Sequence, residues 1–251
     1  MDYPLLWVIV AAALVTQVAT FSTSIYLHRT ETHQSLKMNR YVTLLFRFFL
    51  WVTTGIVRKN WVAIHRKHHA FTDKDGDPHS PLLKGFWSVQ LGNVVHYVRA
   101  TKEAGLLEKY APDMVKDDLW DRWLFNRGQL GLAVGIAILC VVMVFKWGLP
   151  GLGWGMLAAL IHAVTYVFVI SSSINGLCHV VGYKNFNNPG TNLRFVALAS
   201  GGEGLHNNHH AHPRNPKFSV RPSEFDPSWA VIRPLTALNL AEPYRDAGGL
   251  K

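Results

Sequence analysis

Residues 5–27, LLWVIVAAALVTQVATFSTSIYL, contain no charged side chain. At a rise of about 1.5 Å per residue, a helix of this length covers about 35 Å, which exceeds the roughly 30 Å of a bilayer's hydrocarbon core. A cleaved signal peptide is the competing interpretation. However, no basic segment precedes the run, and it ends in His28-Arg29 without a small-residue cleavage pattern. The stretch therefore predicts a membrane-spanning helix.

Two more apolar stretches, 129–145 and 152–174, are separated by the turn-forming segment 147–151 and predict a transmembrane hairpin. The composition agrees, because 49% of the residues are hydrophobic and only 16% are charged, whereas soluble domains have about 25% charged residues. We expect an all-α integral membrane protein with about three transmembrane helices, interfacial helices and a cytoplasmic helical cap.

The segment 41–57, YVTLLFRFFLWVTTGIV, is ambiguous because it is close to the shortest length that can span a bilayer and has Arg47 near its middle. If it crossed the membrane, the histidines before it and after it would lie on opposite sides, and one metal site could not collect both groups. We therefore expect 41–57 to lie in the interface or to pack on the helix bundle, with Arg47 snorkelling to water.

The distribution of basic residues supports this topology. Of the 25 Lys and Arg residues, none precedes residue 28 and only Lys146 lies within 129–178. The positive-inside rule assigns the basic side, which carries the histidines, to the cytoplasm. Topology thus accounts for the net charge of +9, although an acidic electron donor, a thioester phosphate or anionic lipid could also use that face. We expect location in a bacterial inner membrane.

Histidine is unusually frequent, with 13 residues. On a helix, positions 65, 68 and 69 fall within an arc of about 100°, as do 206, 209 and 210, so the three imidazoles of each group can face one centre. Positions 28 and 33 differ by about 140° on an ideal helix, so they would reach two different metals or lie on a distorted helix end. Three clusters result, which together predict a two-metal site: HRTETH (28–33), HRKHH (65–69) and HNNHH (206–210).

Residue type alone does not choose the metal, because neutral imidazole suits iron, copper, nickel and zinc. Eight clustered imidazoles exceed the needs of one ion. The two cysteines, Cys140 and Cys178, each lie in or beside an apolar run, and no paired Glu-x-x-His motifs accompany the histidines, unlike ferritin-like carboxylate sites.

The chain resembles membrane fatty acid desaturases of the Δ9 acyl-CoA and acyl-lipid branch. The resemblance extends from residue 28 to about 213, with a weaker similarity in Phe225 to Trp229. Five motifs carry it: HRTETH (28–33), HRKHH (65–69), DGDPHSP (75–81), NGLCHVVGY (175–183) and GEGLHNNHHAHP (202–213).

The resemblance implies a di-iron centre that uses O₂ to place a double bond in a fatty acyl chain. It also implies that Asn175 holds a water beside one iron. Zinc could occupy the same imidazoles as an inactive substitute. The ligands implied by the resemblance are His28, His33, His65, His68, His69, His179, His206, His209 and His210.

The sequence departs from the family pattern in a few places. Relatives usually carry two spans before the first cluster, and here there is room for one, so we expect an acyl tunnel that is shorter, more open or completed by a neighbouring subunit. Leu205 and His212 stand where aromatic residues are frequent. These departures concern the shape of the pocket and leave the ligand set unchanged.

Several other residues carry expectations. The acidic loop of Asp73, Asp75 and Asp77 does not match a calcium site and could instead hydrogen-bond to ligands. Metal-bound imidazoles usually donate their second N–H to a carboxylate or carbonyl, which makes Glu31, Asp77 and Glu203 candidates for that role. Three further residues, His79, His162 and Trp61, are expected to be structural or to line the tunnel.

We expect one desaturase domain over residues 1–251, with its cap formed by 28–128 and 175–251. The sequence has no haem domain, flavin fingerprint or iron–sulfur cysteine set. Electrons must therefore come from a separate ferredoxin, cytochrome or reductase. Besides this donor, the expected partners are an acyl-CoA, acyl-lipid or acyl carrier protein substrate and membrane lipid, with no nucleic acid.

The nearest alternative to a desaturase is a hydroxylase, acetylenase or terminal-alkene-forming oxidase on the same scaffold. A non-catalytic metal-binding membrane protein is a remote alternative.

Overall fold

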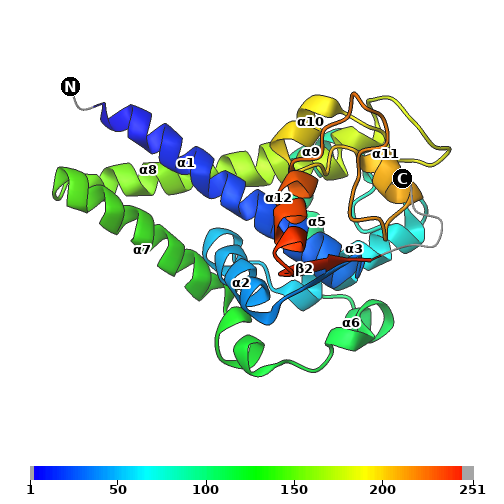
Figure 1. The fold of residues 1–251 in the computed structure, drawn as a ribbon, viewed down its shortest axis with the longest axis horizontal. Coiled ribbons are helices and arrows are strands. Elements are labelled where there is room, and N and C mark those ends of the chain that lie inside the picture. The colour runs from blue at the N-terminus through cyan, green and yellow to red at the C-terminus, as the bar shows by residue number, and fades with distance from the viewer. Residues whose placement is uncertain (1–2, 245–251) are drawn as a thin grey trace.

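The computed structural model describes residues 3–244, so the last seven residues of the expected cap, 245–251, lie outside the described residues. A long helical arm leads into a compact cap (Figure 1). The arm contains α1 (Pro4–Phe21), α7 (Gly128–Trp147) and α8 (Gly151–Val164). Three stretches are long and apolar enough to cross a membrane: Pro4–Thr32, Gly128–Trp147 and Gly151–His179. The expected three-span helical architecture is confirmed.

Two of these stretches continue as π-helices where they approach the cap. α1 runs into η1 (Ser22–Thr32), and α8 runs through η4 (Thr165–Ser171), α9 (Ser172–Asn175) and η5 (Leu177–His179). α1 and α8 pack along each other. Consequently, the spans deliver both the first histidine cluster and His179 to the same end of the molecule.

The cap consists of short helices, and two of them begin at a side-chain cap. Asp226 accepts a hydrogen bond from the Trp229 amide at the start of α12 (Pro227–Ala237), and Ser80 does the same for Leu83 at α4 (Pro81–Lys84). β1 (Leu36–Met38) and β2 (Ala241–Pro243) form an antiparallel pair. The other cap elements are α3 (Arg58–Phe71), α5 (Phe86–Ala100), α6 (Leu106–Tyr110), η2 (Pro112–Met114), η3 (Asp121–Phe125), α10 (Arg194–Ala199) and α11 (His206–Ala211).

The ambiguous segment forms α2 (Arg40–Thr54), which packs against α7 and α1. At its end Gly55 adopts a left-handed conformation, with φ of 63°, and α3 leaves at an angle of 88° to α2. The pair could form one bent span by length and composition. The turn between α2 and α3 brings His65 into the same cluster as His33.

Arg47 does not snorkel to water, so this expectation was wrong. Its side chain is buried, and its guanidinium donates to Asp118 at 2.8 Å and to Asp121 at 2.6 Å. Arg58 pairs with the same Asp121 carboxylate and with Glu31. A buried charge is stable only when it is paired and hydrogen-bonded, and η3 supplies the carboxylate that the sequence of α2 lacks.

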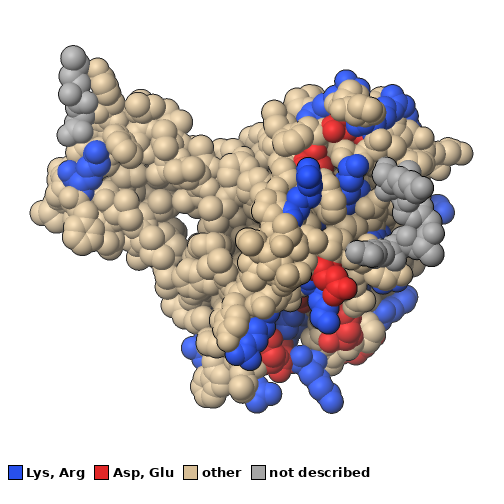
Figure 2. Space-filling view, viewed as in Figure 1, with Lys and Arg blue, Asp and Glu red and all other residues tan. Residues whose placement is uncertain are grey.

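Lysine and arginine side chains gather over the cap, whereas the helical arm is almost free of charge (Figure 2). Lys146 lies at the far end of the arm, in the last turn of α7. The arm also exposes large apolar residues of α1, α7 and α8. An apolar belt of this kind between charged ends is typical of a protein embedded in a bilayer, and together with the three apolar spans it indicates an integral membrane protein.

Replacing Asp121 with Ala should destabilise the protein, because the buried guanidinium of Arg47 would lose one of its two carboxylate partners. We expect a loss of about 2–3 kcal/mol, less than the roughly 3–5 kcal/mol for a fully broken buried pair, since Asp118 still faces Arg47. Asp117→Ala, which removes a more exposed pair with Lys59, should cost less than about 1 kcal/mol. Unfolding of the detergent-solubilised protein measures both, and equal losses would contradict the assignment.

Candidate metal centre

The first histidine pair meets because the backbone there is a π-helix. In η1 the hydrogen bonds span five residues: the His33 amide donates to the His28 carbonyl at 3.1 Å, and the Thr32 hydroxyl donates to the Leu27 carbonyl. Residues five apart therefore lie one above the other. The Nε2 atoms of His28 and His33 are 3.1 Å apart, so this pair serves one centre on a distorted helix end.

The second and third histidine clusters of the sequence each divide between two centres. On α3, His65 and His69 lie one turn apart with their Nε2 atoms at 3.0 Å, while His68 points to the other centre. On α11, His206 and His210 pair in the same way at 3.0 Å. The helical arc would let all three imidazoles of each group face one centre, but the structure divides them, because the i, i+4 pair stays together and the remaining histidine diverges.

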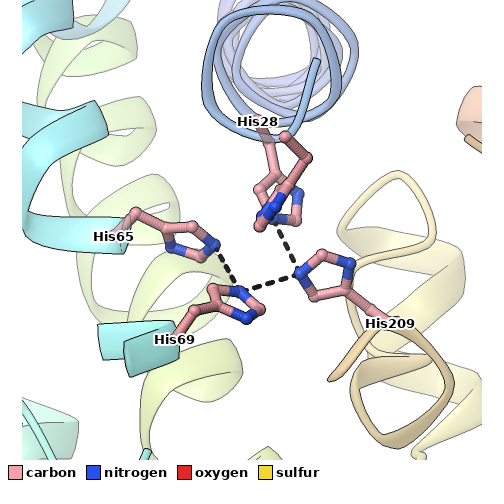
Figure 3. Close-up of side chains that lie close together, drawn as sticks. His28, His65, His69 and His209 are labelled. Atoms are coloured by element: carbon pink, nitrogen blue, oxygen red, sulfur yellow. Dashed lines mark hydrogen bonds between the residues drawn. The ribbon is translucent and has the colours of Figure 1, made fainter. Parts of the chain in front are cut away.

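Two groups of imidazoles result, each with its ligand atoms within 4.8 Å of one another. Figure 3 shows His28, His65, His69 and His209 converging from three separate elements. In cluster one the Nε2 atom of His209 lies 3.1 Å from that of His28 and 3.0 Å from that of His69. Cluster one consists of His28, His33, His65, His69 and His209; cluster two consists of His68, His179, His206 and His210.

The two clusters are adjacent. The rings of His69 and His210 stack at 4.4 Å, and the Nε2 atoms of His68 and His210 are 3.4 Å apart. His179, which the last span delivers, places its Nε2 atom 2.9 Å from that of His206. The structure thus brings together all nine histidines that the sequence indicated, in two groups of five and four.

Five clustered histidines of the cap are neutral imidazoles. Burial lowers the pKa of His65, His69 and His209 well below its usual range, and neighbouring histidines lower it further. The same holds for His206 and His210 in cluster two. A neutral imidazole has one nitrogen with a free lone pair. Several such lone pairs directed at one point repel one another unless a cation lies between them, so the donor set fits a bound metal ion.

Carboxylates orient three of these rings through their other nitrogen. The Nδ1 atom of His28 lies 2.6 Å from Glu203, that of His68 lies 3.0 Å from Asp77, and that of His179 lies 2.8 Å from Asp73. Such a contact places the proton on Nδ1 and leaves the Nε2 lone pair facing the cluster. Of the three carboxylates expected in this role, Asp77 and Glu203 take it, but Glu31 pairs with Arg58 instead.

Two of these carboxylates, Glu203 and Asp73, have pKa values below their usual range. Burial alone would raise the pKa of Glu203, but hydrogen bonds from His28 and Ser24 and the charge of Arg29 outweigh it and lower the pKa. In the same way, hydrogen bonds from His179 and Ser80 overcome burial at Asp73 and lower its pKa. Each cluster therefore has at least one negative charge behind its imidazoles, which favours a cation in front of them.

Arg29 is a structural residue that the sequence did not indicate. It is fully buried, donates to Glu203 at 3.0 Å and to both carboxylate oxygens of Asp226, and lies over the Phe218 ring at 3.7 Å. Asp226 also caps α12. In the sequence, only the weak family similarity around residues 225–229, which include Asp226, pointed to this contact of Arg29. This network locks the C-terminal helix against the first histidine pair.

Asn207 and Asn208, between the histidines of α11, were also missed. The Asn207 amide donates to the Phe186 and Gly190 carbonyls, while its oxygen accepts from two backbone amides. Asn208 donates to Phe218 and Glu224. A helix of six residues has little stability of its own, so these bonds fix the histidines of α11. The available signal in the sequence was the pair of amide side chains between the histidines, because polar residues next to buried ligands must be hydrogen-bonded.

The remaining candidates surround the clusters. Asn175 lies outside both groups; its amide donates to Asn93 and its side chain lines a cavity. Trp61 stacks on His65 at 4.7 Å and lines the same cavity, as does His79, which stacks on His68 and is buried. The Nε2 atom of His79 makes no hydrogen bond within the described residues.

The cavity has a volume of about 520 Å³, within the roughly 300–1,000 Å³ of small-molecule sites. It begins at His28 and His65 and continues between α1, α2, α5 and α8 to His162. Apolar atoms form most of its wall. A site that joins two imidazole clusters to a long apolar cavity within a bundle of membrane helices can bring an unactivated hydrocarbon chain to metal ions.

Comparison with known proteins gives a consistent answer. Residues 4–241 match the family model described as fatty acid desaturase. The acyl-CoA C20 Delta5-desaturase of Anemone leveillei is 30% identical over 237 residues, which cover 92% of this chain and 72% of the relative. The Delta-9 acyl-lipid desaturase 1 of Arabidopsis thaliana is also 30% identical, with the same coverage of both chains. The sn-1 stearoyl-lipid 9-desaturase of Synechocystis is 29% identical and is covered over 72% of its length.

Replacing Asp73 with Asn should weaken metal binding without disturbing the fold. Asp73 has a positive φ of 55°, which Asn tolerates well, so the backbone is kept, whereas the charge and one of the two acceptor oxygens that face His179 and Ser80 are lost. We expect metal affinity to fall by about 10–100-fold, as for other partners of metal-bound histidines. Titration with Fe²⁺ followed by elemental analysis measures it. Asp75→Asn, at an exposed position of the same loop, is the control; wild-type affinity in Asp73→Asn would refute the role.

Proposed function

Because the chain belongs to the fatty acid desaturase family, we propose that it is an O₂-dependent fatty acyl desaturase that introduces a cis double bond into an acyl chain. The single observation that carries this proposal is the convergence of two imidazole clusters at one end of the apolar cavity. Neither acid–base nor nucleophilic side chains can attack an unactivated methylene, whereas a metal centre can support such chemistry.

The proposed ligands are the five histidines of cluster one and the four histidines of cluster two. Each cluster would hold one iron ion. Zinc would fit the same imidazoles but would not support redox chemistry. Bound iron would supply the O₂ activation by which two hydrogens leave neighbouring methylenes. Asn175, close to the clusters along the last span, is proposed to hold a water beside the site.

The residues of this chain position the substrate and keep the site dry. Trp61 and His65 stack at the cavity wall, so a chain that passes them lies against cluster one. Glu203, Asp77 and Asp73 hold the imidazoles in one tautomer from behind. The apolar wall excludes water, which prevents side reactions of an oxidising site, and it fixes which carbon atoms come near the ligands.

The remaining parts of the proposal concern topology and partners. Residues 1–251 are proposed to form one desaturase domain, with spans at about 5–27, 129–145 and 152–174, an interfacial segment at about 41–57 and a cap from 28–128 and 175–251. The basic cap is proposed to face the cytoplasm of a bacterial inner membrane. The substrate is proposed to be an acyl-CoA, an acyl lipid or an acyl carrier protein thioester, and membrane lipid surrounds the arm.

Expression in a host that lacks the activity should produce new unsaturated fatty acids, which mass spectrometry of total lipids detects. His209→Ala removes a ligand of cluster one and should reduce the product to background. His96→Ala changes a half-buried histidine that lies outside both clusters and hydrogen-bonds to Ser88, and it should leave the product unchanged. Hydroxylated products in place of alkenes, or an active His209→Ala variant, would refute the proposal.

The purified iron-loaded enzyme should depend on a separate electron donor, because the sequence carries no recognisable flavin, haem or iron–sulfur motif. With acyl substrate, O₂ and NADH alone we expect no product, and addition of ferredoxin with its reductase should restore turnover. Product analysis by gas chromatography gives the result. Turnover without any added donor would show that the chain reduces its own site.

A further inference from the structure

The helix α7 changes its packing partner along its length. Near its C-terminal end it packs tightly against the start of α8: a Cβ atom on Gly151 would collide with the backbone of Met143, and one on Gly155 with that of Cys140. These two glycines let the helices of the hairpin approach closely, as small residues do in membrane bundles.

Toward its N-terminal end α7 packs against α2 instead. Gly128, Gly131 and Gly135 form a stripe, and a Cβ atom on any of them would collide with a backbone carbonyl oxygen at the C-terminal end of α2 or at Gly55. Because these glycines hold α7 against α2, the helix cannot also follow α8. The two helices of the hairpin therefore diverge from the turn toward the cap.

The divergence leaves a gap in the arm. Figure 1 shows α7 separating from the α1–α8 pair, and in the same view Figure 2 shows an opening between them. The cavity reaches this region, since it is lined there by Leu132 of α7 and by His162 and Ala163 of α8. Leu132 and Ala163 are both exposed, so the deep part of the cavity borders on the surrounding lipid.

Behind the gap the cavity has a wall. His162 hydrogen-bonds through Nε2 to the Thr53 carbonyl at 2.8 Å, and its Nδ1 lies 3.0 Å from the Thr16 hydroxyl. These bonds join α8 to α2 and α1. A chain that reaches His162 from the metal clusters meets this polar junction ahead, while the side toward Leu132 and Ala163 is open.

We propose that the distal end of the acyl chain leaves the protein through the gap between α7 and α8 and lies among the lipid chains. This inference rests on the proposed function and specifies its substrate class: saturated long acyl chains without an upper length limit. Lipid tails are as apolar as the side chains that line the cavity, so exit of the chain has no solvation cost. A length limit would need a steric barrier, which the gap does not provide.

The test is a series of saturated substrates from palmitoyl through stearoyl and icosanoyl to lignoceroyl, supplied to membranes that contain the enzyme. The wild type should convert the series without an abrupt drop. Ala163→Phe and, independently, Leu132→Phe narrow the gap, and each should reduce conversion of the longest chains relative to palmitoyl by about tenfold or more, the usual discrimination of an apolar pocket against added groups.

Val164→Phe is the matched control, because Val164 is exposed on the same helix but does not line the cavity. It should retain the wild-type profile, and the amount of each variant in the membrane is measured alongside. An abrupt cut-off in the wild type, or unchanged profiles in both cavity variants, would overturn the open gap while leaving desaturation intact. Absence of product from every substrate would instead refute the proposed function, and the gap with it.

Discussion

Nine buried or half-buried imidazoles directed at two points constrain the rest of this structure. Their Nε2 atoms lie 2.9–3.4 Å apart in the described pairs, a spacing at which lone pairs repel unless a cation or a shared proton separates them. Cap histidines such as His65 and His209 stay neutral because burial lowers their pKa. Everything that positions these rings must therefore be rigid, since a ring that turned away would leave a buried, unpaired nitrogen.

The chain meets this constraint with elements that would be weak by themselves. A π-helix aligns His28 with His33, and a six-residue helix carries the third histidine cluster. Both are fixed by buried hydrogen bonds: Arg29 joins the first to the C-terminal helix through Asp226, and Asn207 joins the second to the loop before it. Backbone irregularity at a functional site is thus stabilised by polar groups that are fully paired.

Much of this could be predicted from the sequence. Uncharged stretches gave the spans, and the requirement that all histidines reach one site placed the segment 41–57 against the bundle. The division of each histidine cluster between two centres could not be predicted, because it depends on how α3 and α11 face each other. The pairing of Arg47 with Asp121 and of Arg29 with Asp226 was missed for the same reason: the partners lie 74 and 197 positions apart along the chain.

The cap and the arm follow different physical rules, and the cavity passes from one to the other. In the cap, polar networks leave little freedom, so the imidazoles are held in place. In the arm, helices are held by close glycine contacts and separated elsewhere by apolar side chains, and a gap there exposes no polar backbone because each helix satisfies its own hydrogen bonds. A gap between soluble helices would expose apolar surface to water, whereas lipid fills this one without cost. The chemistry of the family requires precise positioning of the acyl chain only near the histidine ligands. The far end of the cavity can therefore stay open to lipid.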